Sequence, residues 1–190
     1  MRRHPTLVAV SGPPGSGKTT LAHALADALG WPAVCRDEIK ERMAAGGGGS
    51  DSAGRPLDLR VLEVFFRTIG ELVESGANAV AEAAFQDRLW HPGLEPFADL
   101  ADIRVVRCAV APELAHERIR RRAAEVPSRA VHADADLLHR IATGERPIES
   151  WVPIALDVPC LLVDTTRDWR PALDGIVAFA TRATFGRDSR

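Results

Sequence analysis

The stretch SGPPGSGKTT, Ser11 to Thr20, decides how the rest of the chain is interpreted. Residues 12–19 match the pattern G-x-x-x-x-G-K-[ST] in full. An apolar run, TLVAV, precedes the loop and a helical pattern follows it, which is the context that the pattern requires. In such a loop, backbone N–H groups converge on phosphate oxygens, and the positive end of the following helix adds to the attraction. The stretch therefore predicts a phosphate-binding P-loop.

The loop also predicts roles for single residues. Lys18 is expected to reach the β and γ phosphates of a nucleotide, and the Thr19 hydroxyl is expected to ligate Mg²⁺. Only Lys18 and Lys40 are lysines among 24 basic residues, which suggests that the loop needs a compact ammonium. The residues expected to contact the nucleotide are those of the loop itself: Gly12, Pro13, Pro14, Gly15, Ser16, Gly17, Lys18, Thr19 and Thr20.

Length and charge limit the class of protein. With 190 residues, the chain is expected to form a single domain over residues 1–190. The 24 basic residues nearly balance 26 acidic ones, so no overall field draws the protein to nucleic acid or to an anionic membrane. No apolar run approaches the roughly 18 residues of a membrane span, and the one at 7–10 is too short for a signal peptide.

Three cysteines, Cys35, Cys108 and Cys160, lie in or beside apolar runs. Because their number is odd and no C-x-x-C spacing occurs, they are expected to be reduced core thiols in a cytoplasmic protein. The dispersed Trp and Phe residues are expected to pack in the core rather than to form a base-stacking platform.

Short apolar runs alternate with helical patterns, which is typical of a parallel α/β sheet. Strands are expected within residues 6–12, 31–36, 77–85, 103–110 and 159–166. Helices are expected at 16–30 with Gly30 as a cap, at 37–45 opened by Asp37, at 57–76, at a short segment ending near Leu100, at 112–125, and from about Arg170. The segment 46–56 has neither propensity and is expected to be mobile.

Asp37 follows the second expected strand directly. Ligands of open parallel sheets bind outside the carboxyl ends of the strands, so Asp37 is a candidate to accept a proton from a substrate hydroxyl. The alternative is an ordinary helix N-cap, a position that aspartate favours.

Glu82 lies near the end of the otherwise apolar third strand, where a charge is costly without a partner. Mg²⁺, bound directly or through water, would be such a partner. An exposed strand end or an ion pair with an arginine are the alternatives.

The helix 112–125 places Arg118, Arg121 and Arg122 at i, i+3 and i+4, and hence on one face. Together with Arg129, they are candidates to close over a triphosphate and neutralise its charge. A solvated basic face is the alternative. The histidines of 132–140 lack the spacing of a metal site, and a lid helix is the better interpretation.

These motifs in this order resemble the P-loop small-molecule kinases related to chloramphenicol phosphotransferase and zeta toxin, often labelled AAA family ATPases. The resemblance rests on GPPGSGKTT, RDEIKERM, VAEAAF, ERIRRR and VDTT, and it covers most of the chain. It implies a three-layer α/β/α P-loop NTPase fold with a five-stranded parallel sheet in the order 2-3-1-4-5 and a lid at about 118–140. Little chain remains after VDTT for the helical C-terminal domain of a remodelling motor.

The resemblance also implies transfer of the ATP γ-phosphoryl group to a hydroxyl of a small molecule, with ATP and Mg²⁺ as cofactors. Lys18 and Thr19 would hold phosphate and Mg²⁺, Asp37 would be the base, and Arg118 and Arg122 would be lid arginines. Glu82 stands where relatives often have aspartate. A kinase of a nucleotide-sugar or of a nucleic-acid end, and an ATP-binding regulatory switch, are the alternatives, and the oligomeric state is open.

Overall fold

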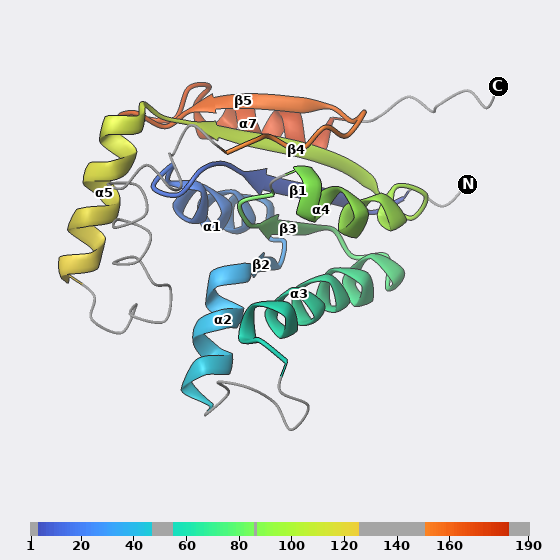
Figure 1. Ribbon diagram of the computed structural model, residues 1–190. Coiled ribbons are helices and arrows are strands. Elements are labelled where there is room, and N and C mark those ends of the chain that lie inside the picture. The colour runs from blue at the N-terminus through green and yellow to red at the C-terminus, as the bar shows by residue number, and fades with distance from the viewer. Residues whose placement is uncertain (1–3, 47–54, 86, 126–150, 183–190) are drawn as a thin grey trace.

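The structure is a computed structural model that describes residues 4–46, 55–85, 87–125 and 151–182. Its centre is a five-stranded sheet with the strand order β2-β3-β1-β4-β5, in which every neighbouring pair is parallel (Figure 1). This confirms the predicted P-loop NTPase fold and strand order. The strands are β1 (Thr6–Ser11), β2 (Ala33–Cys35), β3 (Ala79–Glu82), β4 (Asp102–Ala109) and β5 (Cys160–Asp164).

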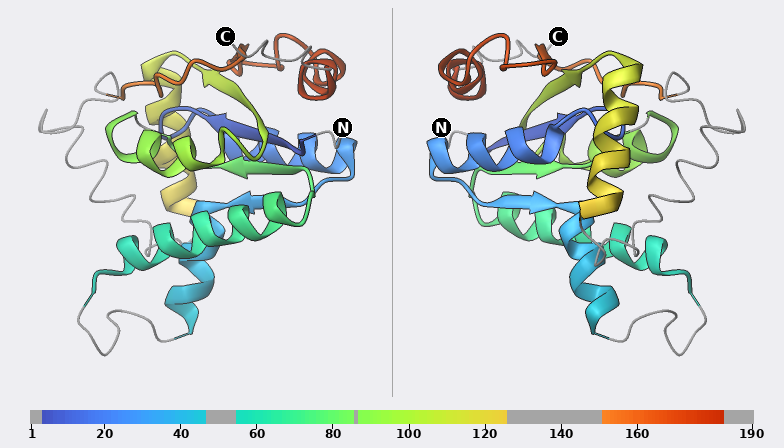
Figure 2. Two further views of the ribbon diagram at one scale, coloured as in Figure 1. Left: turned by 90° about the vertical axis from the view of Figure 1, so that its right-hand side faces the viewer. Right: turned by 90° about the vertical axis from the view of Figure 1, so that its left-hand side faces the viewer.

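Helices cover both faces of the sheet, because the central strand β1 is apolar on both sides. Its residues Leu7 to Val10 are completely buried. Figure 2 shows α1 and α7 on one side of the sheet and α4 on the other. The helices are α1 (Lys18–Leu29), α2 (Arg36–Ala45), α3 (Leu57–Glu74), α4 (Asp87–Leu94), the 3₁₀ helix η1 (Glu95–Phe97), α5 (Pro112–Glu125) and α7 (Leu173–Thr181).

Two apolar clusters hold the three layers together. On one face, Val8 and Val10 of β1 pack with buried residues of α1 and with Ile176 of α7. On the other face, Leu7 and Ala9 pack with residues of α2, α3 and α4. The alternation of successive β1 side chains between the two clusters is the period of two that a strand imposes.

Aromatic residues fill the second cluster, as expected for core residues. Phe65 and Phe66 of α3 contact Trp90 of α4, and the rings of Phe85 and Trp90 have centroids 4.9 Å apart. Such edge-to-face pairs add about 0.5–1.5 kcal/mol beyond the burial of their area.

Several element boundaries follow the sequence pattern closely. Gly30 caps α1 with φ at 66°, a left-handed conformation that favours glycine, and its N–H bonds to the Asp27 carbonyl. By contrast, α2 begins one residue earlier than predicted, so Cys35 and not Asp37 occupies the N-cap position. The last helix begins at Leu173, three residues after the predicted start.

The prediction of three core thiols is wrong for one of them. Cys35 and Cys108 are buried, whereas Cys160 is exposed because it begins the edge strand β5. Most of the segment 46–56 and the part of the expected lid beyond residue 125 lie outside the described residues. Within the described residues, no helix is both long and apolar enough to cross a membrane.

Candidate functional site

The P-loop connects the buried end of β1 to the first turn of α1. Gly17 is the N-cap of α1 with φ at 76°, which places Lys18 and Thr19 at the start of the helix. Gly15 has φ at 77°, and a Cβ built on it would lie 2.4 Å from the Ala115 carbonyl oxygen of α5. Glycine is therefore required at position 15 by its backbone conformation and by the close approach of α5. The loop leads directly into the N-terminal end of α1, where anions are favoured.

Lys18 and Glu82 lie opposite each other at this end of the sheet. The Lys18 Nζ atom is 3.7 Å from Glu82 Oε1, and the Glu82 side chain is only 1% exposed. Apart from the Thr19 hydroxyl, which is close enough to lower the Glu82 pKa by hydrogen bonding, neither carboxylate oxygen has a hydrogen-bond partner within the described residues. Burial raises the pKa of Glu82 above its ordinary value, and the charge of Lys18 opposes this shift only in part. The interpretations of Glu82 as an exposed strand end or as the partner of an arginine are both wrong for the described structure.

Glu82 and Thr19 fit a magnesium ion. Thr19 acts on the same carboxyl group, since its side chain lowers the Glu82 pKa. A buried carboxylate with unused lone pairs beside a hydroxyl is the oxygen donor set that Mg²⁺ prefers. The two residues expected to hold the ion therefore lie together, on elements that are 63 positions apart in the chain.

Asp37 lies at the same edge of the sheet. In the parallel register Cys35 stands opposite Glu82, so the first turn of α2 begins beside the end of β3. The charge of Asp37 contributes to the raised pKa of Glu82, which is a sign of their proximity. Asp37 is about one third exposed, and Arg36 Nη1 donates to its Oδ1 at 3.2 Å. Because α2 starts at Arg36, the N-cap interpretation of Asp37 is wrong.

A charge cluster that the sequence did not reveal joins α2 to α3. Arg36 Nη2 and Lys40 Nζ lie 2.7 Å and 2.9 Å from Asp58 Oδ1. Burial raises the pKa of Asp58, but the hydrogen bonds and charges of Lys40 and Arg36 outweigh it and hold the pKa below its ordinary value. In the sequence, the i, i+4 spacing of Arg36 and Lys40 indicates only that the two side chains share a helix face. The cluster could not be predicted from it, because their acidic partner lies on a different helix.

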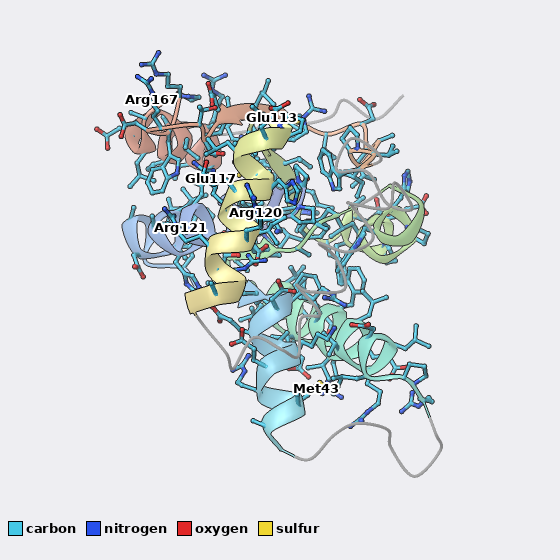
Figure 3. The ribbon with its side chains drawn as sticks, turned by 60° about the vertical axis from the view of Figure 1, so that its left-hand side comes forward. Met43, Glu113, Glu117, Arg120, Arg121 and Arg167 are labelled. Atoms are coloured by element: carbon cyan, nitrogen blue, oxygen red, sulfur yellow. The ribbon has the colours of Figure 1, made fainter. Side chains whose placement is uncertain are left out.

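On the other side of the P-loop lies a cleft of about 730 Å³. Its walls are the P-loop, α5, the segment after β5 and the start of α7, and Thr20 in the first turn of α1 also lines it. The cleft is basic, because four arginines line it: Arg118, Arg121, Arg122 and Arg167. Figure 3 shows Arg121 on α5 and Arg167 beside α7. The three arginines predicted to share a helix face thus do face one cleft.

Arg118 is bound to the backbone rather than free to move. Its Nη2 donates to the Thr165 and Thr166 carbonyls at 2.8 Å and 3.0 Å, and its Nη1 lies 3.4 Å from the Gly15 carbonyl. The Thr165 hydroxyl lies 2.6 Å from the Ser16 carbonyl oxygen. Arg118 and Thr165 therefore fasten α5 and the end of β5 to the P-loop.

The remaining predicted site residues are placed as follows. Pro13 and Pro14 are half-buried in the loop, and Gly12 and Ser16 are buried. Arg129 lies outside the described residues. Trp169 packs against the apolar cluster of β1, α1 and α7, as expected, and it also lines the cleft. The segment Thr165–Trp169 had no predicted role in the site. The motif VDTT indicated where this segment lies in the sequence. Its role in the site follows only from its contact with the P-loop in the structure.

Comparison with known proteins agrees with this geometry. A family model described as an AAA domain matches residues 7–142, and the chain belongs to this family. A protein of Chloroflexus aurantiacus, provisionally described as a kinase, is 28% identical with a TM-score of 0.76, covering 93% of this chain and 97% of that one. No curated protein shows significant similarity to the chain.

Two more distant structures share the fold. A sugar kinase of Janibacter sp. is 17% identical with a TM-score of 0.56, covering 94% of this chain and 99% of that one. A chain of the Pnkp1/Rnl/Hen1 RNA repair complex is 20% identical with a TM-score of 0.56, covering 76% of this chain and 47% of that one. The chain thus belongs to the AAA-domain family and shares the fold of these structures.

Proposed function

We propose that the protein is an ATP- and Mg²⁺-dependent phosphotransferase that transfers the γ-phosphoryl group to a hydroxyl of a small molecule. The observation that carries the proposal is the pair of Lys18 with the buried carboxylate of Glu82, at the edge of the sheet where Asp37 also lies. If the ion pair only stabilised the fold, the basic partner of Glu82 would not have to be the lysine of the P-loop. A site that must hold a metal beside phosphates does need this combination.

The nucleotide would occupy the P-loop and the basic cleft beside it. The N–H groups of the loop and Lys18 would hold the phosphates, while the cleft between α5 and Trp169 would take the nucleoside. Arg122 and Arg121 line the cleft and would supply positive charge to the transferring group. Arg118, bound to three backbone carbonyls, would act by fixing α5 against the loop.

The acceptor would approach from the side of β2 and α2. Asp37 would accept its hydroxyl proton and orient the oxygen for in-line attack on the γ phosphorus. The proton moves to the Asp37 carboxylate as the O–P bond forms, and ADP leaves with the electrons of the broken bond. When bound at Thr19 and Glu82, Mg²⁺ would neutralise charge on the phosphate oxygens.

The comparisons support this proposal at the level of the family. The similar protein of Chloroflexus aurantiacus is provisionally described as a kinase, and it matches nearly the full length of both chains. The similarity to the sugar kinase of Janibacter sp. supports the fold alone.

The test is an ATP-consumption assay with Mg²⁺ against aminoglycosides, phenicols, sugars, nucleosides and nucleotide-sugars. We expect one class to stimulate turnover and the stimulation to vanish in Lys18→Ala. Lys40→Ala is the matched control for the P-loop lysine, because Lys40 pairs with Asp58. Tight ATP binding without stimulation by any acceptor would contradict the proposal and favour a nucleotide-dependent switch. Stimulation by oligonucleotide ends would instead favour a nucleic-acid kinase.

A further inference from the structure

Three side chains with metal-binding atoms meet between α1, the end of β2 and α2. They are His23, Cys35 and Glu38, and their ligand atoms all lie within 4.8 Å of one another. His23 Nε2 is 2.5 Å from Glu38 Oε1 and 3.7 Å from Cys35 Sγ. One ring nitrogen thus faces both a carboxylate and a thiol, each from a different element of the fold.

The cluster is open on one side and closed on the other. The His23 and Glu38 side chains are 46% and 41% exposed, whereas Cys35 is buried. A cation held by the two accessible side chains would lie next to the thiol. Cys108, by contrast, packs within an apolar cluster.

Cys35 is buried, but acidic side chains lie near it. It belongs to neither of the two apolar clusters. Glu82, Glu38 and Asp37 are close enough for their charges to act on it. An ordinary hydrogen bond between His23 and Glu38 explains their contact, but it does not explain a thiol placed at the third corner among carboxylates.

The distance between the Cys35 sulfur and the His23 nitrogen fits a zinc ion. With Zn–S at about 2.3 Å and Zn–N at about 2.0–2.1 Å, a tetrahedral angle separates sulfur and nitrogen by about 3.6 Å. The observed distance from Cys35 Sγ to His23 Nε2 is 3.7 Å. The nitrogen and the carboxylate oxygen would have to move apart to about 3.3 Å. Both side chains are half-exposed and can turn without disturbing the core.

We infer that His23, Cys35 and Glu38 form a binding site for Zn²⁺, with water as the fourth ligand. On binding, the Cys35 thiol loses its proton to solvent and coordinates as thiolate. The ligand set of nitrogen, sulfur and oxygen separates this site from the all-oxygen set at Thr19 and Glu82, which suits Mg²⁺. The site does not depend on the proposed phosphoryl transfer.

Zinc would link the helix that follows the P-loop to the helix that carries Asp37. His23 lies on α1 and Glu38 lies on α2, one position after Asp37. The ion would therefore fix α2 relative to α1, and it would stabilise the folded state by an amount that grows with the logarithm of the free Zn²⁺ concentration above the dissociation constant.

The test uses the full-length, metal-free protein without nucleotide, in excess Mg²⁺. Titration with Co²⁺ is expected to give one equivalent of a tetrahedral site with a thiolate-to-cobalt charge-transfer band, which Zn²⁺ then displaces. His23→Ala and Glu38→Gln should each weaken Zn²⁺ binding by about 10-fold or more, measured against a chromophoric chelator. Cys35→Ser should abolish the charge-transfer band.

Cys160→Ser and His116→Ala are matched controls, because they change the same residue types outside the cluster. Both should bind like the wild type. Binding that is unchanged in His23→Ala and Glu38→Gln, or a charge-transfer band that is lost in Cys160→Ser, would overturn the assignment, as would the absence of any Co²⁺ or Zn²⁺ binding. Because His23 and Glu38 are half-exposed, their variants decide the matter even if Cys35→Ser fails to fold.

Discussion

Lys18 at the start of α1 and Glu82 at the end of β3 face each other across 3.7 Å, with the carboxylate almost completely buried. Burial raises the pKa of Glu82 more than the charge of Lys18 lowers it. The ionised pair is therefore a cost to the folded state until a cation and phosphates join it. This arrangement is expected of a site that is completed by its ligands.

Replacing Glu82 with glutamine should stabilise the nucleotide-free protein at neutral pH, because the variant has no buried carboxylate to ionise. The unfolded chain loses the Glu82 proton at the ordinary value of 4.5, whereas the folded state retains it to higher pH. The cost of ionisation thus grows as the pH rises from 4.5 through the folded pKa. Thermal unfolding of Glu82→Gln and wild type between pH 4 and 8 should show a gap that widens with pH. A less stable variant at pH 7 would contradict this.

Substitution of Gly15 by alanine should destabilise the protein by about 1–3 kcal/mol, because left-handed backbone strain and a clash with Ala115 add together. Gly30→Ala is the matched control. Its φ is also positive, at 66°, but nothing lies within 4 Å of the added Cβ. Urea unfolding should show a clearly larger loss of unfolding free energy for Gly15→Ala than for Gly30→Ala. Equal losses would contradict the close contact of α5 with the loop.

Truncation of Arg118 should loosen α5 from the P-loop. Arg118→Ala removes charge-assisted bonds to the Thr165 and Thr166 carbonyls, and we expect a loss of about 1–3 kcal/mol together with weaker nucleotide binding. Arg120→Ala, exposed on the same helix, should change stability by no more than about 0.5 kcal/mol. Calorimetric titration with ATP and thermal unfolding measure both quantities. Similar behaviour of the two variants would refute the fastening role.

The three cysteines should differ sharply in reactivity. Burial raises the pKa of the Cys108 thiol to about 12 and also raises that of Cys35, so neither forms the reactive thiolate at neutral pH. Cys160 is exposed. An aromatic disulfide reagent should label one thiol in the folded protein and three after denaturation, with no fast labelling in Cys160→Ser. Rapid labelling of two thiols in the folded protein would contradict the burial of Cys35 and Cys108.

Much of the fold could be predicted because its signals are local. The P-loop spacing, the apolar runs and the cap at Gly30 each lie within a few residues of the chain, and they defined the strands and most helices. The isolated charge of Glu82 in an apolar strand likewise indicated a buried partner. That this partner is Lys18 could not be predicted, because it depends on the pairing of β1 with β3, a contact between distant segments.

Other features of the site arise only from such distant contacts. The backbone bonds of Arg118 join α5 to a segment 47 residues further on, and no periodicity records them. The meeting of His23 with Cys35 depends on how α1 packs against β2. The start of α2 at Arg36 shifted Asp37 from the cap into the first helical turn, a difference of one residue that propensities do not resolve.

The central claim is that Asp37 and the P-loop act on one transferred phosphoryl group. The most direct measurement follows the γ-phosphoryl label of ATP into an organic acceptor in a single turnover, for wild type and Asp37→Asn. We predict labelled acceptor in the wild type and a rate about 10²- to 10⁴-fold lower in the variant, with ATP affinity unchanged. Label that reaches only inorganic phosphate, or equal rates in the two proteins, would contradict the account.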